Sequence, residues 1–512
     1  MATSAPELSQ QPPSTPHPPS LPEPSSQSDE PYSIFDKRQK VVIVALASTA
    51  ATFSGFASNI YFPALPSIAR SLNVSIEKVN LTVTSYLIFQ GLAPSLWGPI
   101  SDVKGRRVAY ICTFVVLLGA CIGLGLSRNY AALVVLRCVQ STGSASTIAI
   151  GAGVIGDVTT RAERGGYMGV FQAGLLAPVA VGPVIGGAVS GALGWRAVFW
   201  VLAVYAGVFL GVLLLVLPET GRVVVGNGGW MSEGWVARYP LSVYQRCTRV
   251  GFERRKGRPP GIKPSVDMLG PLRILACRYA APVVVFLAVY YAVWQMSITA
   301  MSTLFEERYG LSETQIGLTF IANGVGSIIG TLSTGKILDR DYKRVQRAFE
   351  AQRLSSNQQG DDSHTAFPIE KARLRLVPIL SLIQCASILL FGWTIAYPAR
   401  IHIAVPIIST FVTGWTAVST QSVVMTYLVD VFPGRSAAAS ASLNLARCLF
   451  AAGGTSFIMP MVNGVGVGWA FTICTLVQVV ALLGLAVQWR FAGRWRMADE
   501  AKARSEEAEE RK

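Results

Sequence analysis

The sequence has few charged residues for its length. Asp, Glu, Lys and Arg make up 14% of its 512 residues, against about 25% in an average soluble protein. Hydrophobic residues make up 51%, and the mean hydropathy is +0.43. Such a chain has too little charge to cover a soluble globule of this size. Its net charge of +15 does not indicate nucleic-acid binding either, because the basic residues lie between long apolar runs rather than on a basic face.

Paired cysteines, clustered histidines and nucleotide-binding loops are also missing. The eight cysteines show no Cys-x-x-Cys spacing, and the three histidines are scattered in polar segments. We therefore expect neither a metal site nor a disulfide framework, and most cysteines should pack as small hydrophobic residues. No G-x-x-x-x-G-K-[ST] loop occurs, which argues against nucleotide binding. We expect no cofactor and no enzymatic activity.

Long apolar runs are what the sequence has instead. About 20 helical residues cross the roughly 30 Å hydrocarbon core of a bilayer, and twelve runs are long enough. These runs lie near residues 41–64, 79–98, 108–127, 130–156, 167–193, 197–217, 279–304, 313–336, 376–397, 404–429, 437–463 and 469–489. They predict an all-α membrane protein with twelve transmembrane helices, arranged as two pseudo-symmetric six-helix bundles around a central cavity.

The remaining segments divide the chain into five parts. Residues 1–31 contain nine prolines among Ser, Gln and Glu, which predicts a disordered tail. Residues 32–217 and 279–489 are the two expected bundles. Between them, residues 218–278 form a basic linker, and residues 490–512 form a charged tail.

The basic residues also predict the orientation in the membrane. With the N-terminus in the cytoplasm, the inner segments carry 36 of the 44 Lys and Arg residues and the outer loops carry six, as the positive-inside rule requires. Both termini and the linker should therefore be cytoplasmic. The excess charge at the inner face favours contact with anionic membrane lipid.

A weak repeat relates the two halves. At an offset of 237 residues, the segment 72–79 matches 309–316, and Gly98-x-x-x-Asp102 matches Gly335-x-x-x-Asp339. Internal repeats of this kind are common in transporters.

Several motifs resemble those of the major facilitator superfamily. The run 98–107, Gly-Pro-Ile-Ser-Asp-Val-Lys-Gly-Arg-Arg, resembles the loop signature of that family, although Val103 replaces its usual basic residue. The fourth run resembles its arginine motif, with Ser141 in place of a usual Gly. The fifth run is similar to the glycine-proline motif of the drug:proton antiporter branch, and the chain as a whole resembles fungal quinidine-resistance transporters and organic-acid or citrate exporters. The residues that match these three motifs are Gly98, Asp102, Gly105, Arg106 and Arg107, then Leu133, Arg137, Gln140 and Gly143, and then Gly182, Pro183, Gly186 and Gly187.

The loop motif predicts a conformational latch at the inner face. Asp102 is expected to neutralise the N-terminus of the helix that begins near Ser436 in the other half. Arg106 is then expected to reach Asp157, as the inter-half latch of the family implies, and Arg107 and Asp339 belong to the same motif and its copy. The alternative is a positive-inside loop with no further role.

Small residues in the fifth run predict a packing surface or hinge. Gly182, Gly186 and Gly187 leave one face free for the backbone of a neighbour, and Pro183 is expected to bend the helix. The eighth run contains Gly324, Gly326 and Gly330 and is the expected partner across the halves. Simple helix packing is the alternative interpretation.

Arg137 and Arg447 lie deep within spans, where an arginine that faces lipid costs several kcal/mol. No Asp or Glu lies centrally in any span, so neutral partners such as Gln140, Asn444, Gln90 or Asn323 are expected. Two guanidiniums without an acid favour anionic or neutral polar solutes. Further side chains expected to line the cavity are Tyr290, Tyr291, Trp294, Gln295, Trp415, Thr416, Ser419, Thr420 and Gln421. The alternative is that the two arginines are satisfied structurally and the aromatic residues face lipid.

These features together favour a monomeric secondary transporter in the plasma membrane that moves a small organic molecule outward, coupled to protons as the resemblance implies. Uptake of a polar nutrient or polyamine, and a non-transporting sensor, are the alternatives. Asn73-Val-Ser75 is a possible glycosylation sequon in the first outer loop.

Overall fold

Twelve long helices make up most of the computed structural model, which describes residues 31–160, 163–231, 239–257, 269–355, 369–432 and 436–510. Each expected span corresponds to one of these helices. Ten helices are long and apolar enough to cross a membrane by length and composition. The other two, α3 (Ile76–Lys104) and α16 (Ala404–Val431), are rich in Asn, Gln, Ser and Thr, which lowers their hydropathy.

The first half of the chain supplies six long helices. Asp36 caps the first one, because it accepts a hydrogen bond from Gln39 N–H while the Gln39 side chain accepts one from Asp36 N–H, an arrangement that satisfies free donors of the first turn. The elements of this half are α1 (Lys37–Asn59), η1 (Phe62–Ala64), α2 (Leu65–Leu72), α3, α4 (Arg106–Leu126), α5 (Tyr130–Val158), α6 (Arg164–Leu193) and α7 (Trp195–Val216).

The second half supplies the other six. Its elements are α12 (Ala281–Tyr309), α13 (Glu313–Ser355), α14 (Ile369–Leu374), α15 (Val377–Ala396), α16, α17 (Ser436–Val465) and α18 (Val467–Glu510). Between the halves lie α8 (Arg222–Val225), β1 (Trp230–Met231), α10 (Leu241–Cys247), β2 (Arg255–Lys256) and α11 (Gly270–Leu275), and β1 pairs with β2 in parallel.

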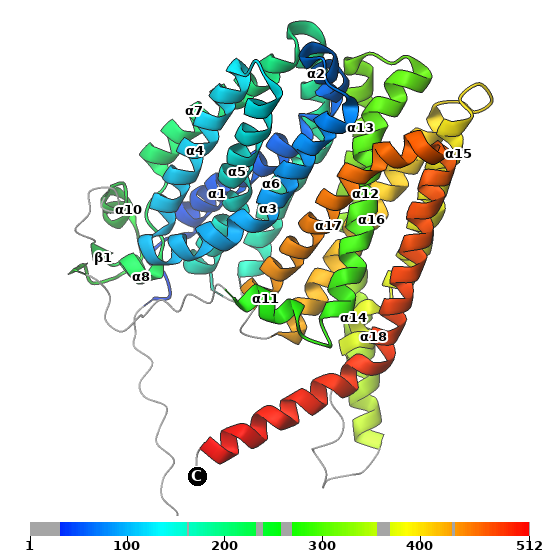
Figure 1. Cartoon of the computed structure of the whole chain (residues 1–512). Helices are drawn as coiled ribbons and strands as arrows, with labels where there is room; N and C mark the ends of the chain where they lie inside the picture. The colour runs from blue at the N-terminus through cyan, green and yellow to red at the C-terminus, as the bar shows by residue number, and fades with distance from the viewer. Residues whose placement is uncertain are drawn as a thin grey trace, which may run out of the picture.

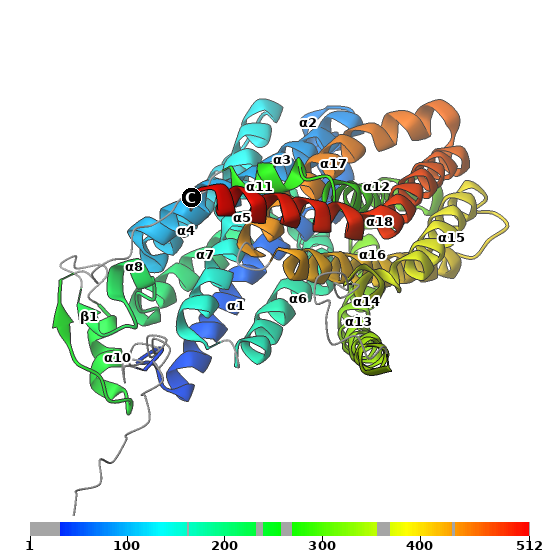
Figure 2. The ribbon, with the colours of Figure 1, turned by 90° about the horizontal axis from the view of Figure 1, so that it is seen from below.

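The two halves lie side by side as separate bundles (Figure 1). Each has its own apolar core, and a third cluster that includes Tyr61, Phe62, Met296 and Phe320 joins them. We call the end of the molecule that carries α2 and the α12–α13 turn the α2 end, and the opposite end the terminal end, because the described chain begins and finishes there (Figures 1 and 2).

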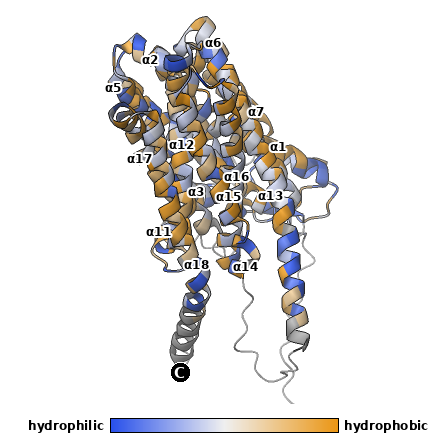
Figure 3. Ribbon diagram, turned by 90° about the vertical axis from the view of Figure 1, so that its right-hand side faces the viewer, coloured by the Kyte–Doolittle hydropathy of each residue, from blue (hydrophilic) through white to orange (hydrophobic). Residues whose placement is uncertain are grey.

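Three segments are more ordered than the sequence suggested. Helices α13 and α18 continue about five turns beyond the expected inner ends of their spans, because the Ala, Arg, Gln and Glu residues that follow favour helix. The coloured part of the α13 extension is more hydrophilic than the bundle (Figure 3). The described parts of the linker are folded and hold the segment 31–36, where Ile34 is fully buried. Residues 1–30 lie outside the described part of the chain.

Candidate functional site between the two bundles

The two bundles contact each other through α3 and α17 at the α2 end. Asn463 Nδ2 donates to Glu77 Oε1 at 2.8 Å, and the hydroxyl oxygens of Thr84 and Ser456 lie 2.8 Å apart. Nearer the middle, a Cβ added to Gly91 would lie 3.1 Å from the Cβ of Cys448. Seven residues further towards the terminal end, a Cβ added to Gly98 would meet no atom within 4 Å. The α3–α17 contact is therefore tight at the α2 end and has ended by Gly98.

Helices α6 and α13 form a second contact between the halves. A Cβ on Gly324 would overlap Ala180, one on Gly187 would overlap the carbonyl oxygen of Glu313, and one on Gly317 would lie 2.5 Å from the carbonyl oxygen of Pro183. Not all the glycines expected in this contact take part in it, however. Gly182 and Gly186 face the end of α1, while Gly326 and Gly330 face α16, because successive glycines on a helix point in different directions.

Charged residues also connect the halves at the α2 end. Arg70, on α2, forms an ion pair with Glu306, and its other terminal nitrogen lies 3.8 Å from Glu313 Oε1. The Arg70 side chain is 63% exposed, so each pair is weak. No sequence pattern indicates this cluster, because its members come from three separate helices.

Arg447 lies near the middle of α17 and is half-buried. It donates from Nε and one terminal nitrogen to Asn444 Oδ1 at 3.2 and 2.9 Å, and from the other terminal nitrogen to Gln421 Oε1 at 3.1 Å. Its guanidinium carbon lies 4.8 Å from the ring centroid of Tyr291. Asn444 Nδ2 donates to the carbonyl oxygen of Gln90, on α3, at 3.2 Å, so this cluster bridges the two halves.

Arg137 has a different environment, inside the first bundle and only 1% exposed. It donates to Gln140 Oε1 at 2.6 Å and to the carbonyl oxygen of Ala57 at 3.0 Å. Its guanidinium carbon lies 4.2 Å from the ring centroids of both Tyr61 and Tyr86. Arg137 therefore has Gln140, one of the neutral partners expected from the sequence, and two aromatic rings enclose it, as in the alternative of a structurally satisfied arginine.

The other side chains expected to line a cavity differ in position. Trp294 Nε1 donates to Asn323 Oδ1 at 3.0 Å, and Trp415 Nε1 donates to Ser333 Oγ at 3.4 Å, so both link neighbouring helices of the second half. Thr416 is buried and bonds to its own helix, and Gln295 is also buried.

Tyr290 packs into the core of the second half, where its hydroxyl lies 3.6 Å from Cys385 Sγ. The expectation that Tyr290 lines the cavity is wrong, because one residue along a helix turns a side chain by about 100°. Its neighbour Tyr291 faces Arg447.

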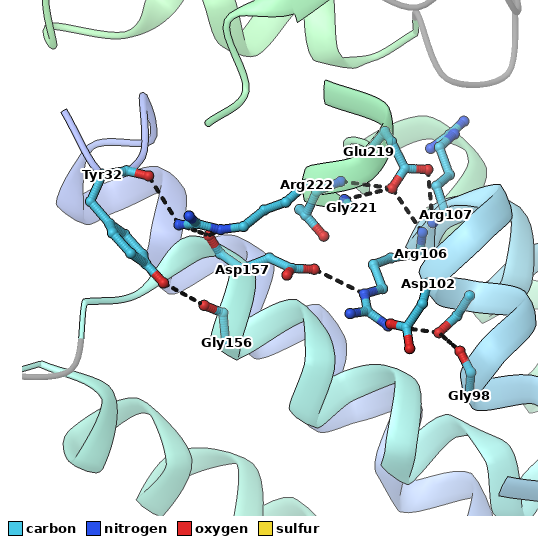
Figure 4. Close-up of polar contacts among 12 residues, drawn as sticks. Tyr32, Gly98, Asp102, Arg106, Arg107, Gly156, Asp157, Glu219, Gly221 and Arg222 are labelled. Atoms are coloured by element: carbon cyan, nitrogen blue, oxygen red, sulfur yellow. Dashed lines mark hydrogen bonds and ion pairs between the residues drawn. The ribbon is translucent and has the colours of Figure 1, made fainter. Parts of the chain in front are cut away.

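A network of charged residues holds the terminal end of the first half together (Figure 4). Arg106 Nε lies 2.9 Å from Asp157 Oδ2, and a terminal nitrogen of Arg106 lies 2.6 Å from Asp102 Oδ1. Arg107 turns the other way and donates to the last carbonyl groups of α7, which include those of Leu213, at 3.1 Å, and Leu214, at 2.6 Å. All these partners belong to one half.

Glu219, which follows α7, is a further member of this network and is fully buried. Its carboxylate accepts hydrogen bonds from the backbone N–H groups of Arg106, Arg107, Thr220 and Gly221, at 2.8 to 3.2 Å. Burial raises the pKa of the Glu219 carboxyl, although these donors act in the opposite direction. Sequence reasoning missed the role of this residue, which lies in the run Leu217-Pro218-Glu219-Thr220.

Gly105 is required by the same arrangement. Its φ is 101°, in the region that favours glycine, and a Cβ at this position would overlap the Glu219 carboxylate. Two independent features therefore require glycine at this position of the loop motif, namely the positive φ and the close approach of the Glu219 carboxylate.

The expected inter-half latch is not the arrangement found. Arg106 and Asp157 do pair, but they join α4 to α5 within one half, and Asp102 pairs with Arg106. The residues just before α17 and the side chain of Asp339 lie outside the described part. The second half has an equivalent ion pair, in which Arg373 Nε lies 2.7 Å from Asp430 Oδ2 at the end of α16. The sequence repeat did not indicate this pair.

The N-terminal segment docks beside this network. Arg222 donates to the carbonyl oxygens of Tyr32 and Asp157 and stacks on the Tyr32 ring at 3.8 Å, while the Tyr32 hydroxyl donates to the carbonyl oxygen of Gly156 at 3.1 Å (Figure 4). Nearby, the hydrogen bond from Lys40 holds the pKa of Glu163 below its ordinary value.

Asn73, the possible glycosylation site, is the exposed residue that ends α2, with a φ of 51°. Its glycosylation remains a prediction.

Comparison with known proteins gives consistent results. Residues 47–455 match the family described as Major Facilitator Superfamily. The chain is 36% identical over 488 residues to Citrate exporter 1 of Aspergillus niger, covering 94% of this chain and 91% of that protein. It is 32% identical to Quinidine resistance protein 1 of Saccharomyces cerevisiae, covering 87% and 82% respectively. Among solved structures, it is similar in fold to the E. coli xylose transporter in a partially occluded inward open conformation, with a TM-score of 0.62, 16% identity and coverage of 89% and 98%.

Proposed function

Because the chain belongs to the major facilitator superfamily, we propose that this transporter exports small organic molecules across the plasma membrane by alternating access. The relatives named for citrate export and quinidine resistance support export. They also indicate organic acids and drugs as the first substrates to test, and secondary metabolites are the third class we propose.

The observation that carries this proposal is the asymmetry between the two ends of the molecule. At the α2 end, the halves meet through α3 with α17, α6 with α13, and the Arg70 ion pairs. Midway along the bundle, Arg447 is half-buried at the inter-half contact. A pair of rigid bundles that close at one end and separate at the other suits a rocking motion about a central site.

We place the terminal end in the cytoplasm, because most basic residues lie there and positive charge favours the inner face. The structure would then be open to the inside, with the Arg70 cluster closing the outside. In the outward-facing state we expect the α2 end to open and the loop motif with Asp102 and Arg106 to approach the second half, where Asp339 occupies the equivalent position in α13.

Proton exchange is the driving force we propose. No carboxylate lies centrally in any span, so the groups that take up and release protons are expected at the ends. Asp157 is the candidate at the terminal end, and Glu306 and Glu313 are the candidates at the α2 end. The working unit is taken as a monomer, since one chain supplies both halves.

Transport by the purified protein in sealed proteoliposomes tests this function. Radiolabelled citrate and quinidine should move across the membrane without ATP, and an imposed pH gradient should accelerate their movement. Transport that requires ATP and ignores the gradient would contradict the proposal.

An epitope tag placed within 218–278 tests the orientation. It should react with antibody only after the cells are permeabilised. Labelling of intact cells would reverse the assignment of the two ends.

A further inference from the structure

We propose that Arg447 is the anchoring group for a negatively charged substrate, and that the transported molecule is therefore an organic anion that presents a carboxylate. The assignment of this ligand as a substrate rests on the proposed function, whereas the anion site itself can be tested separately. The depth of Arg447, its neutral partners, its exposure and its position between the halves support this assignment.

Arg447 is a cation without a counter-charge. It lies eleven residues past Ser436, the first residue of α17, or about 16 Å along the helix at 1.5 Å per residue. Among the described residues, no carboxylate forms an ion pair with Arg447, whose partners are the neutral side chains of Asn444, Gln421 and Tyr291. A permanent positive charge at this depth is costly, and a bound anion would offset that cost.

The guanidinium group still has donors for a ligand. A guanidinium has five N–H groups, and the bonds to Asn444 and Gln421 use three of them. One N–H on each terminal nitrogen is then free of these bonds, and two such donors match the two oxygens of a carboxylate. Asn444 and Gln421 fix the plane of the group, so it is already oriented before a ligand arrives.

A second polar group next to this site also lacks a partner. Gln90 is 8% exposed, and its side-chain Oε1 is buried without a hydrogen bond. Its backbone oxygen is the atom that binds Asn444, which places this residue in the same cluster. Gln90 Oε1 can accept a hydrogen bond from a hydroxyl or a protonated carboxyl of the ligand, so a hydroxy acid or a polybasic acid suits the site better than a simple fatty acid.

The position of the cluster connects binding with movement of the halves. Arg447 and Gln421 belong to the second half, whereas Gln90 belongs to the first, and Asn444 bonds across the contact. A ligand held by Arg447 would compete with or extend this cross-half contact. Binding and the relative position of the halves are therefore expected to influence each other.

Arg137 does not offer an equivalent site. The rings of Tyr61 and Tyr86 both lie 4.2 Å from its guanidinium carbon, and the side chain is 1% exposed. A ligand could reach it only after the first bundle had rearranged. The two deep arginines therefore have separate roles, and the anion site contains one of them.

Equilibrium binding to the purified full-length chain in detergent tests the site, with radiolabelled citrate as the anionic probe and quinidine as the cationic one. Arg447→Gln should weaken citrate binding roughly ten- to a hundredfold, as expected for loss of one charge-assisted contact. Arg447→Lys should bind citrate nearly as weakly as Arg447→Gln, because an ammonium cannot reproduce the planar pair of donors.

Arg196→Gln is the matched control. Arg196 is also half-buried, stacks on Trp195 at 4.2 Å and donates to a carbonyl oxygen, and its replacement should leave citrate binding unchanged.

The outcomes separate this inference from the proposed function. Citrate binding that is absent in the unaltered protein, or equal in Arg447→Gln, would overturn the anion site. If quinidine is nevertheless transported by proteoliposomes, the exporter function remains. If citrate binds in an Arg447-dependent way but no solute crosses the membrane, the anion site is supported and the transport function is wrong.

Discussion

The enclosure of Arg137 by two tyrosine rings makes stability, rather than ligand binding, its main expected contribution. Arg137→Gln should lower the free energy of unfolding by about 2–3 kcal/mol, because it removes a desolvated cation–π contact and a charge-assisted hydrogen bond. Thermal unfolding of the purified protein in detergent should show a lower melting temperature. Arg447→Gln, at a half-buried position, should change the melting temperature much less. Equal melting temperatures for Arg137→Gln and the unaltered protein would contradict this division of roles.

Glu219 provides a second test at a single residue. Glu219→Gln keeps one acceptor oxygen but places an NH₂ group against the N–H of Arg107 or against the other donors, so at least one buried hydrogen bond is lost. The expected cost is about 1.5–3 kcal/mol, measured as a lower melting temperature. Glu253→Gln serves as the control, since the Glu253 side chain is 83% exposed and should contribute almost nothing. Identical shifts for the two variants would show that the carboxylate network does not stabilise the loop.

At the level of helices, the close approach of α6 and α13 depends on particular glycines rather than on a general abundance of small residues. Gly187→Ala would force a methyl group onto the carbonyl oxygen of Glu313, an overpacking expected to cost about 1–3 kcal/mol. The α2 end should then close less readily, which hydrogen–deuterium exchange would detect as faster exchange at the start of α13. Gly169→Ala, in the same helix, is the control because its Cβ would meet no atom within 4 Å. Faster exchange in both variants would mean that α6 is generally destabilised and that the contact is not specific.

The molecule as a whole appears in one arrangement of its halves, and the Arg70 cluster should help to maintain that arrangement. Each exposed ion pair contributes about 0.2–1 kcal/mol. Arg70→Glu removes its pairs with Glu306 and Glu313 and adds repulsion between carboxylates. It should therefore shift the balance towards opening of the α2 end, by about fivefold for each kcal/mol lost. Glu306→Arg should also favour opening. In the double variant the ion pair is re-formed with reversed charges, so much of the preference for the closed α2 end should return. Hydrogen–deuterium exchange of the amides in α2 and at the end of α12 measures this opening, since exchange becomes faster when the α2 end opens.

High salt should reduce the difference between Arg70→Glu and the unaltered protein, since it screens exposed charges. Additive effects of the two substitutions, without recovery in the double variant, would show that Arg70 and Glu306 do not interact.

The sequence alone determined the number, order and approximate limits of the long helices. Each helix had to bury an apolar run of membrane-spanning length, and this requirement is local and can be counted along the chain. The sequence also identified Arg137 and Arg447 as unusual, because a charge deep in a span is costly wherever it points. It identified Gly105, Asp102 and Arg106 through their shared motif.

Only the tertiary structure decided which way those residues face. The rotation of each helix about its axis is set by contacts with its neighbours. That rotation gives Tyr291 and Tyr290, and likewise Gly187 and Gly186, different environments, and it leaves Arg137 enclosed but Arg447 half-buried. Contacts between distant segments, such as Arg70 with Glu306 or Arg373 with Asp430, leave no periodic pattern in the sequence. They arise when helices pack within one bundle or between the two, because packing brings together charges whose separation along the chain carries no information about their distance in space.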